Sequence, residues 1–403
     1  MSTRALPTIV AAGDARPPRP VRRLLRELEH PSELFVNLGP QWFASVMGTG
    51  IVANAAALLP VSVPGLDTAA LIVWVLAATM LTVVLGATAI HWLRHPETAR
   101  AHASNPAMAP FYGAPPMALL TVGAGTLLVG RQLTGMHAAV SIDALLWAAG
   151  TVAGLASSVA IPYLMFTRHR IEQQMTLATW LMPIVPPMVS AATGAALVAH
   201  LPDGQDRLTL LLGCYAMFGL SLIASLIVIT LVWARLAYHG PGPAETVPTL
   251  WIVLGPLGQS ITAANLLADQ APHTIGAPYA SALNALGVLY GVPIWGFAAL
   301  WLCLAAAITL RTARERLPFT LSWWSFTFPV GALVTGTSEL ALHTHLHVFA
   351  VASVALYALL LAAWATAALN TARGALTGRL FRPPRTTASH TSTSRRHRAP
   401  TYR

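Results

Sequence analysis

TWLMPIVPPMVSAATGA, at residues 179–195, is an apolar segment that contains three prolines and no charged residue. Proline lacks a backbone hydrogen-bond donor and its ring clashes with the preceding helical turn, so it breaks or kinks a helix from within. Hydrocarbon tolerates a broken backbone only where the break is buried in protein or lines a water-filled cavity. The segment therefore predicts a broken membrane helix in the interior of a larger bundle.

The same kind of break recurs along the chain at a nearly constant interval. Intervals of 68 to 73 residues separate Pro115, Pro183, Pro256 and Pro329, and the first apolar run carries the paired glycines Gly48 and Gly50. Each interval holds two apolar runs, so the repeating unit is a helical hairpin. At any single site the proline could simply kink an ordinary membrane helix. The regular interval favours five tandem hairpins.

Composition agrees with a membrane environment. The 403 residues are 55% hydrophobic and 9% charged, against about 25% charged in soluble proteins. The fold class expected is all-α integral membrane, with ten helices each able to cross about 30 Å of hydrocarbon. The expected spans are 41–59, 68–92, 111–130, 142–166, 176–199, 208–236, 249–267, 279–310, 319–342 and 348–369.

Arginine distribution predicts the orientation of these spans. With a cytoplasmic N-terminus, 22 of the 24 arginines lie on the inner side, and only Arg131 and Arg207 lie outside. The positive-inside rule predicts this asymmetry and places both termini in the cytoplasm of a plasma-membrane protein. The same distribution explains the net charge of +10 without a nucleic-acid partner. Expected domains are a basic tail at 1–40 with a possible interfacial helix, a transport domain at 41–370, and a tail rich in Arg, Ser and Thr at 371–403.

Because two-span units enter the membrane from the same side, they are expected to close into a ring of broken helices around a central pore. The middle portions of these helices contain no acidic or basic residue, so the pore should be neutral. Helix ends exposed at the breaks would present partial positive charge to anions. The expected lining and kink residues are Gly48, Thr49, Gly50, Pro116, Pro186, Pro187, Ser190, Thr193, Pro256, Gln259, Ser260, Pro329 and Thr335.

Four motifs in order resemble the tellurite-resistance/dicarboxylate transporter family, over roughly residues 35–370. They are WFASVMGTGI (42–51), TWLMPIVPPMVSAATGA (179–195), LGPLGQS (254–260) and LPFTLSWWSFTFPVGA (317–332). That family includes the bacterial tellurite-resistance channel, fungal malic-acid permeases and sulfite efflux pumps, and plant slow anion channels. The resemblance implies small anions as substrates, a homotrimer in the lipid bilayer, and a phenylalanine that closes the pore from the ninth span.

Phe328 is the expected gate, because it immediately precedes Pro329 and its position in SWWSFTFP matches that of the family's occluding phenylalanine. Phe326 is the alternative, about 200° around the helix. The absence of a buried ionisable relay favours a channel or uniporter. The substrate could be malate or another C4-dicarboxylate, sulfite, tellurite, nitrate or chloride, and the alternative mechanism is proton-coupled transport or efflux of a dicarboxylate, sulfite or tellurite.

Other functional classes are less well supported. A membrane-embedded enzyme needs paired acids or a nucleophile with a base at mid-depth, and no such set is found, so neither catalysis nor a cofactor is expected. A sensor or scaffold could use the C-terminal tail for docking. His343, His345 and His347 form either a zinc or pH-sensing site or an ordinary interfacial loop.

Overall fold

The computed structural model describes residues 24–28, 30–170 and 172–381. Most of these residues are helical, and none of them lies in a β-strand. The outer parts of both tails, to which some of the sequence-based expectations apply, lie outside these described residues. Of the segment considered for an interfacial helix, residues 24–27 form bends and turns and Pro31–Phe35 forms a 3-10 helix, η1.

Five helices are long and uninterrupted, with 29 to 37 residues each. At 1.5 Å per residue each exceeds the roughly 30 Å of bilayer hydrocarbon. Two of them contain an internal proline, Pro162 and Pro293. These helices are α2 (Leu66–Arg94), α6 (Met136–Thr167), α8 (Gln205–His239), α10 (Tyr279–Glu315) and α12 (His347–Thr377).

Five shorter helices alternate with the long ones, and a 3-10 segment precedes each. They are α1 (Phe43–Ala57), α4 (Ala114–Gly125), α7 (Pro186–Val198), α9 (Leu254–Gln270) and α11 (Phe328–Thr344). The preceding segments are η2 (Pro40–Trp42), η3 (Ala109–Gly113), η6 (Ala178–Leu181), η7 (Ala244–Val253) and η9 (Leu321–Phe326). Pro116, Pro186, Pro187, Pro256 and Pro329 lie in the first turn of the α-helix that follows the break. Proline is tolerated there because first-turn amides have no partner within the helix.

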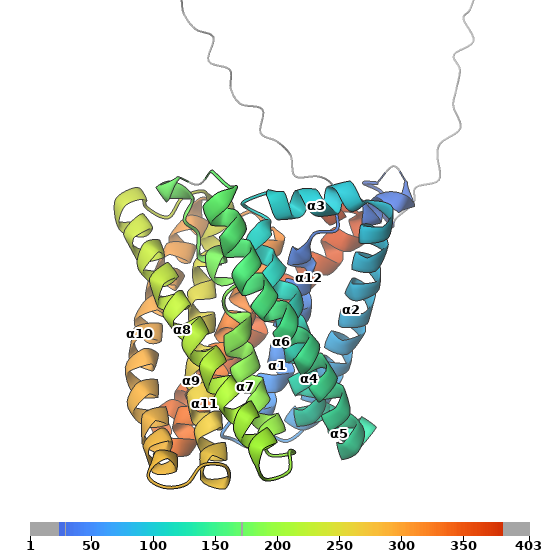
Figure 1. Cartoon of the computed structure of the whole chain (residues 1–403). Helices are drawn as coiled ribbons and strands as arrows, with labels where there is room; N and C mark the ends of the chain where they lie inside the picture. Colours follow the sequence, from blue (N-terminus) through green and yellow to red (C-terminus); the bar gives the residue numbers. More distant parts are fainter. Residues whose placement is uncertain (1–23, 29, 171, 382–403) are drawn as a thin grey trace, which may run out of the picture.

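The short helices form a closed ring. Helix α1 packs against α4, α4 against α7, α7 against α9, α9 against α11, and α11 back against α1. Each also packs against the long helix that follows it in the chain, so the long helices lie outside the ring (Figure 1). Burial supports this arrangement: 83% and 94% of the apolar windows around α4 and α9 are buried, against 22 to 28% in the long helices. The outer faces are therefore apolar and exposed, as lipid contact requires.

Smaller elements complete the chain. Helix α3 (Pro96–Ser104) lies across one end of the bundle, as Figure 1 shows at the top. A π-helical turn (Thr126–Gly130) and the short α5 (Arg131–Thr134) extend α4. Three further 3-10 turns are η5 (Gln173–Met175), η8 (Ala271–His273) and η10 (Arg379–Phe381). The Leu25 amide donates to the Leu376 carbonyl at 2.7 Å, so the two ends of the described chain lie on the same side of the bundle.

Seven helical segments of the described chain are long and apolar enough to cross a membrane: the five long helices and the segments Ala109–Thr134 and Ala244–His273. The chain is therefore a multi-pass, all-helical membrane protein. The three remaining expected spans correspond to α1, α7 and α11, which have 15, 13 and 17 residues. Length and composition alone thus support fewer crossings than the ten expected.

Helices α9 and α11 approach each other to backbone contact. A Cβ atom added at Gly258 would lie 2.4 Å from the backbone of α11, and one at Gly336 would lie 2.6 Å from the Gly258 carbonyl oxygen. Real side chains cannot occupy that space, so both glycines are needed for this packing. The close approach brings the polar faces of α9 and α11 together inside the ring.

Candidate functional site: a two-chambered cavity inside the ring

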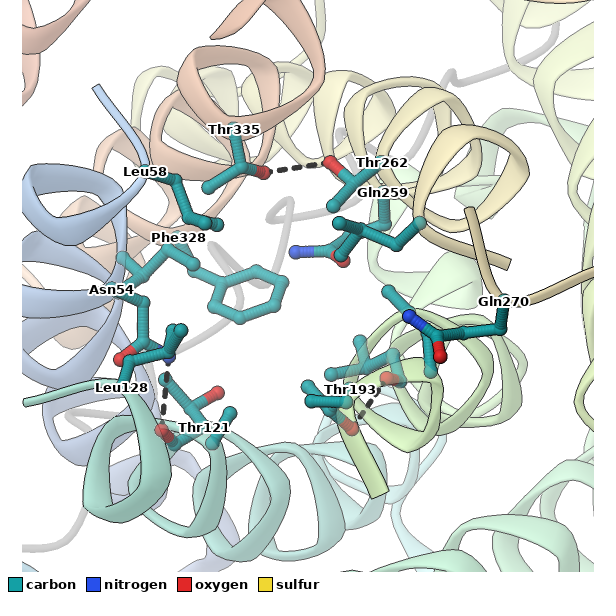
Figure 2. A pocket seen from close by; sticks show the side chains of 17 residues that line it. Asn54, Leu58, Thr121, Leu128, Thr193, Gln259, Thr262, Gln270, Phe328 and Thr335 are labelled. Carbon is teal, nitrogen blue, oxygen red and sulfur yellow. Dashed lines mark hydrogen bonds between the residues drawn. The ribbon is translucent and has the colours of Figure 1, made fainter. Parts of the chain in front are cut away.

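A cavity of about 240 Å³ lies inside the ring and is lined by residues from all five short helices (Figure 2). Its apolar lining includes Ile51, Leu58 and Leu266, and its polar lining consists of threonines and amides. No lining residue is charged. The complete lining is Ile51, Asn54, Leu58, Thr121, Ala124, Leu128, Val189, Ala192, Thr193, Ala195, Ala196, Gln259, Thr262, Leu266, Gln270, Phe328 and Thr335.

Most hydroxyls in this cavity are held by hydrogen bonds to the protein. Thr193 donates to the Val189 carbonyl at 2.9 Å, and the hydroxyls of Thr262 and Thr335 lie 2.8 Å apart, joining α9 to α11. The side-chain amide of Gln259 makes no hydrogen bond to another described residue and projects into the cavity (Figure 2). An amide N–H is a good donor to an anion, so Gln259 is the polar group best placed to meet one.

Asn54 adds a fixed polar group on the opposite side of the cavity. Its Nδ2 donates to the Thr121 carbonyl oxygen at 3.0 Å, and this bond joins α1 to α4. Its Oδ1 is buried and has no hydrogen-bond partner in the described chain. An unsatisfied buried acceptor is costly, so a hydrated or liganded cavity would stabilise this arrangement.

A second, narrower cavity of about 20 Å³ lies on the other side of Phe328. Its lining is largely apolar and comes from the starts of all five ring helices, from η3, η7 and η9, and from the turn between η6 and α7. Phe328 lines both cavities and is only 3% exposed. Figure 2 shows its ring projecting toward the middle of the larger cavity. The phenyl ring therefore separates the two chambers.

The break between η9 and α11 holds Phe328 in this position. Thr327, at the break, donates its hydroxyl to the Trp324 carbonyl oxygen at 2.7 Å. Trp324 is 1% exposed, and its indole N–H donates to Thr371 of α12 at 3.0 Å. A Cβ at Gly48 would lie 2.2 Å from the Thr327 hydroxyl, so only glycine permits α1 to approach here. Packing against two helices thus fixes the backbone that carries Phe328.

Phe326 has a different environment. Its ring makes edge-to-face contacts with Trp251 at 5.2 Å and with Trp323 at 5.7 Å between centroids. It is not among the residues that line either chamber. The two phenylalanines therefore differ, with Phe328 between the chambers and Phe326 in an aromatic cluster.

The other expected site residues fall into two groups. Thr193, Gln259 and Thr335 line the larger chamber, and Pro256 and Pro329 line the smaller one. The rest pack between helices. The Thr49 hydroxyl accepts a hydrogen bond from the Trp364 indole at 3.2 Å, and the Ser190 hydroxyl accepts one from Thr151 at 2.9 Å. Ser260 donates its hydroxyl to the Leu257 carbonyl at 2.8 Å. Among the glycines and prolines, Pro116 and Pro186 lie against Gly154 of α6, Gly50 lies against Thr121, and Pro187 is buried in α7.

Sequence reasoning missed Asn54, Thr121 and Gln270, which all line the larger chamber. Gln270 continues the helical face of Gln259, Thr262 and Leu266, so the 3.6-residue period could have identified it. Asn54 and Thr121 carry no comparable signal, because Thr121 is the single polar residue of α4 and Asn54 does not continue the helical face of another lining polar residue in α1.

Comparison with known proteins identifies a family to which this sequence is similar. The sequence profile described as "Voltage-dependent anion channel" matches residues 37–372. A sulfite efflux pump SSU1 from Arthroderma otae is 28% identical over 352 residues, covering 86% of this chain and 93% of its own length. An uncharacterized transporter from Methanocaldococcus jannaschii is 27% identical over 361 residues, covering 89% and 99%. A putative malic acid transport protein from Schizosaccharomyces pombe is 24% identical over 308 residues, covering 74% and 70%. These relatives are named as transporters or pumps, not as enzymes.

Proposed function

This chain belongs to the voltage-dependent anion channel family, and on that premise we propose that it conducts small anions passively through the ring of short helices. The observation that carries the proposal is the pair of uncharged chambers separated by the Phe328 ring. A charged lining would bind or repel ions strongly, whereas a neutral lining with a few amide donors allows an anion to enter and to leave.

Helix orientation supports a preference for anions. The smaller chamber is surrounded by the first turns of α9 and α11, through Pro256 and Pro329, and by Met117 and Val185 near the starts of α4 and α7. The N-terminal end of a helix carries partial positive charge. Together with the start of α1, five such ends around one constriction favour negative solutes over cations, and no acidic side chain lines it.

Sulfite and C4-dicarboxylates such as malate are the substrates proposed, with chloride and nitrate as inorganic alternatives. The support is the names of two relatives, a sulfite efflux pump and a putative malic acid transport protein. Both substrate types are small oxyanions whose oxygens accept hydrogen bonds. Gln259 would donate to such an oxygen in the larger chamber.

The proposed architecture has ten spans arranged as five hairpins, each made of a ring helix and the long helix after it. Packing of each short helix on its successor supports the hairpins. The contact between Leu25 and Leu376 supports an even number of crossings, because it keeps both ends on one side. Arginine asymmetry makes that side the cytoplasm. A homotrimer in the plasma membrane completes the proposal and rests on the family resemblance.

Phe328 is the proposed gate. Its ring occupies the boundary between the chambers and cannot clear the path without leaving its rotamer. A narrow apolar constriction of this kind also excludes water, and dewetting alone can block ions.

Proton-coupled transport is the second candidate mechanism, and Glu339 is the observation that favours it. Glu339 lies one helical turn beyond Thr335 of the larger chamber and is 2% exposed. A buried carboxyl near a pathway can carry a proton. The two mechanisms separate in liposomes that contain the purified protein. Passive conduction continues when the proton gradient is collapsed at fixed voltage, whereas coupled transport stops.

A further inference from the structure

Three potential metal ligands from two ring helices converge beyond the larger chamber. One ligand atom each from Asp269, Glu339 and His343 lies within 4.8 Å of the others. The His343 Nε2 atom is 2.9 Å from Asp269 Oδ1, and His343 Nδ1 is 3.9 Å from Glu339 Oε2. The cluster joins the last turn of α9 to the last turns of α11.

The cluster lies at the end of the chamber opposite Phe328. Glu339 and His343 follow Thr335 at intervals of four residues, so the three occupy one face of α11. Asp269 directly precedes Gln270, which lines the chamber. At 1.5 Å per residue, His343 is about 22 Å along the helix from Phe328. A ligand bound here would act at a different level from the gate.

An ionised Glu339 at this place would need a cation beside it. Two carboxyl groups share one imidazole, and the Glu339 carboxyl is almost completely buried. If Glu339 is ionised, one negative charge is left uncompensated even with the imidazole protonated, whereas a protonated Glu339 leaves the cluster neutral. Burying an unpaired charge is expensive. Among described residues, the salt bridges at this cluster involve only these three side chains.

The His343 ring gives a second indication. Besides Asp269, its neighbour is the Glu339 backbone carbonyl oxygen, 2.8 Å from Nδ1. Both neighbours are acceptors, so without a metal the ring must carry protons on both nitrogens. A metal ion could replace one of these protons and also supply the missing positive charge.

We propose that Asp269, Glu339 and His343 bind a divalent transition-metal ion, with Zn²⁺ as the best match. One imidazole nitrogen and two carboxylate oxygens are ordinary zinc donors at about 2.0 to 2.2 Å. Tetrahedral geometry at those lengths places ligand atoms about 3.4 Å apart, so ligand atoms that lie within 4.8 Å of one another would draw slightly closer around the ion. A fourth position remains for water or an anion. The bound ion would tie α9 to α11, the pair that carries the Thr262–Thr335 hydrogen bond.

The proposed ligand set differs from the three histidines considered from the sequence. Of His343, His345 and His347, only His343 belongs to the cluster found among the described residues. Its partners come from one turn earlier in α11 and from α9. His347, an exposed residue at the start of α12, offers a matched control.

Zn²⁺ titration of the purified, untagged full-length chain tests the site. We expect one high-affinity Zn²⁺ per chain, and at least a tenfold weaker dissociation constant in His343→Ala and in Asp269→Asn. His347→Ala should bind like the wild type. Co²⁺ should give the absorption bands of a four-coordinate site in the wild type and lose them in both cluster variants. Affinity should fall as the pH is lowered, because protons compete for the histidine.

Equal Zn²⁺ affinity in the wild type and the two cluster variants would overturn the site, as would an equal loss in His347→Ala. Thermal unfolding in excess chelator shows whether each variant is folded. Because Asp269 is 45% exposed, Asp269→Asn is the variant least able to disturb packing, and its result decides if His343→Ala is unstable. The readout is metal binding, so it stands or fails independently of anion conduction.

Discussion

Replacing Phe328 with alanine would remove the ring that separates the two chambers. If the ring must turn about 30° off its rotamer for an anion to pass, that step costs about 0.5 to 1.5 kcal/mol. Removing it should increase flux about two- to tenfold, since each 1.4 kcal/mol is a factor of ten. Joining the chambers of about 240 and 20 Å³ also lets water fill the constriction, which adds to the gain.

Stability sets the second expectation for this variant. A fully packed phenylalanine costs about 3 to 5 kcal/mol when truncated to alanine. The Phe328 ring has empty space on two sides and so loses fewer contacts, and we expect a cost at or below the low end of that range. The variant should therefore reach near-normal yield.

Phe326→Ala is the matched control, because it lies two residues away but outside both chambers. It loses two edge-to-face contacts worth about 0.5 to 1.5 kcal/mol each. We expect lower yield or melting temperature and no gain in flux. Anion-selective electrodes or a quenched fluorophore in liposomes report flux per folded protein. Unchanged or reduced flux in Phe328→Ala, or an equal gain in Phe326→Ala, would refute the gate.

Three further experiments test the ring, its polarity and its orientation. Gln259→Glu places an acidic side chain in the larger chamber at almost constant shape, so anion flux per folded protein should fall at least tenfold, and the melting temperature should also fall because the carboxylate is buried and unpaired; unchanged flux would remove Gln259 from the pathway. Gly258→Ala pushes a Cβ into the α11 backbone and should lower the stability of the fold by at least about 1 to 3 kcal/mol, the usual cost of overpacking. Gly255→Ala, whose added Cβ has no atom nearer than 3.9 Å, should be tolerated, and equal melting temperatures for the two variants would contradict the close approach of α9 and α11. In a background without native cysteines, Gln205→Cys should react with an impermeant thiol reagent in intact cells and Ala313→Cys should not, and the reverse pattern would invert the orientation.

The broken ring helices were largely predictable from sequence. Proline fixes backbone geometry locally, so Pro186 and Pro329 mark helix starts whatever surrounds them. Their recurrence also indicated which segments are buried. By contrast, the 3-10 geometry of segments such as η7 depends on packing against neighbouring segments, and no local signal reports it.

Which side chains face the cavity was harder to predict. Thr193 and Thr335 line the chamber, whereas Thr49 and Ser190 hydrogen-bond to outer helices. A ring helix is buried on all sides, so burial does not distinguish the side that faces the cavity from the side that packs against an outer helix. Threonine and serine hydroxyls can also donate hydrogen bonds to backbone carbonyl oxygens of their own helix, so their polarity alone does not show that they face a pore.

Long-range pairs were beyond sequence reasoning. Asp269 and His343 are 74 residues apart and meet only because α9 and α11 pack closely. Gly258 and Gly336 make that approach possible, but their spacing does not reveal which helix each one contacts. The cluster of Asp269, Glu339 and His343 could therefore be recognised only from the three-dimensional structure of the ring.

Anion flux in proteoliposomes, measured at clamped voltage with the proton gradient present and then collapsed by a protonophore, tests passive conduction most directly. With sulfite, malate, chloride or nitrate as the carried anion, we expect flux that follows the anion gradient and the voltage and is unchanged when the proton gradient disappears. Flux that stops with the proton gradient, or protein-dependent flux that is absent for all four anions, would contradict passive conduction through the neutral ring.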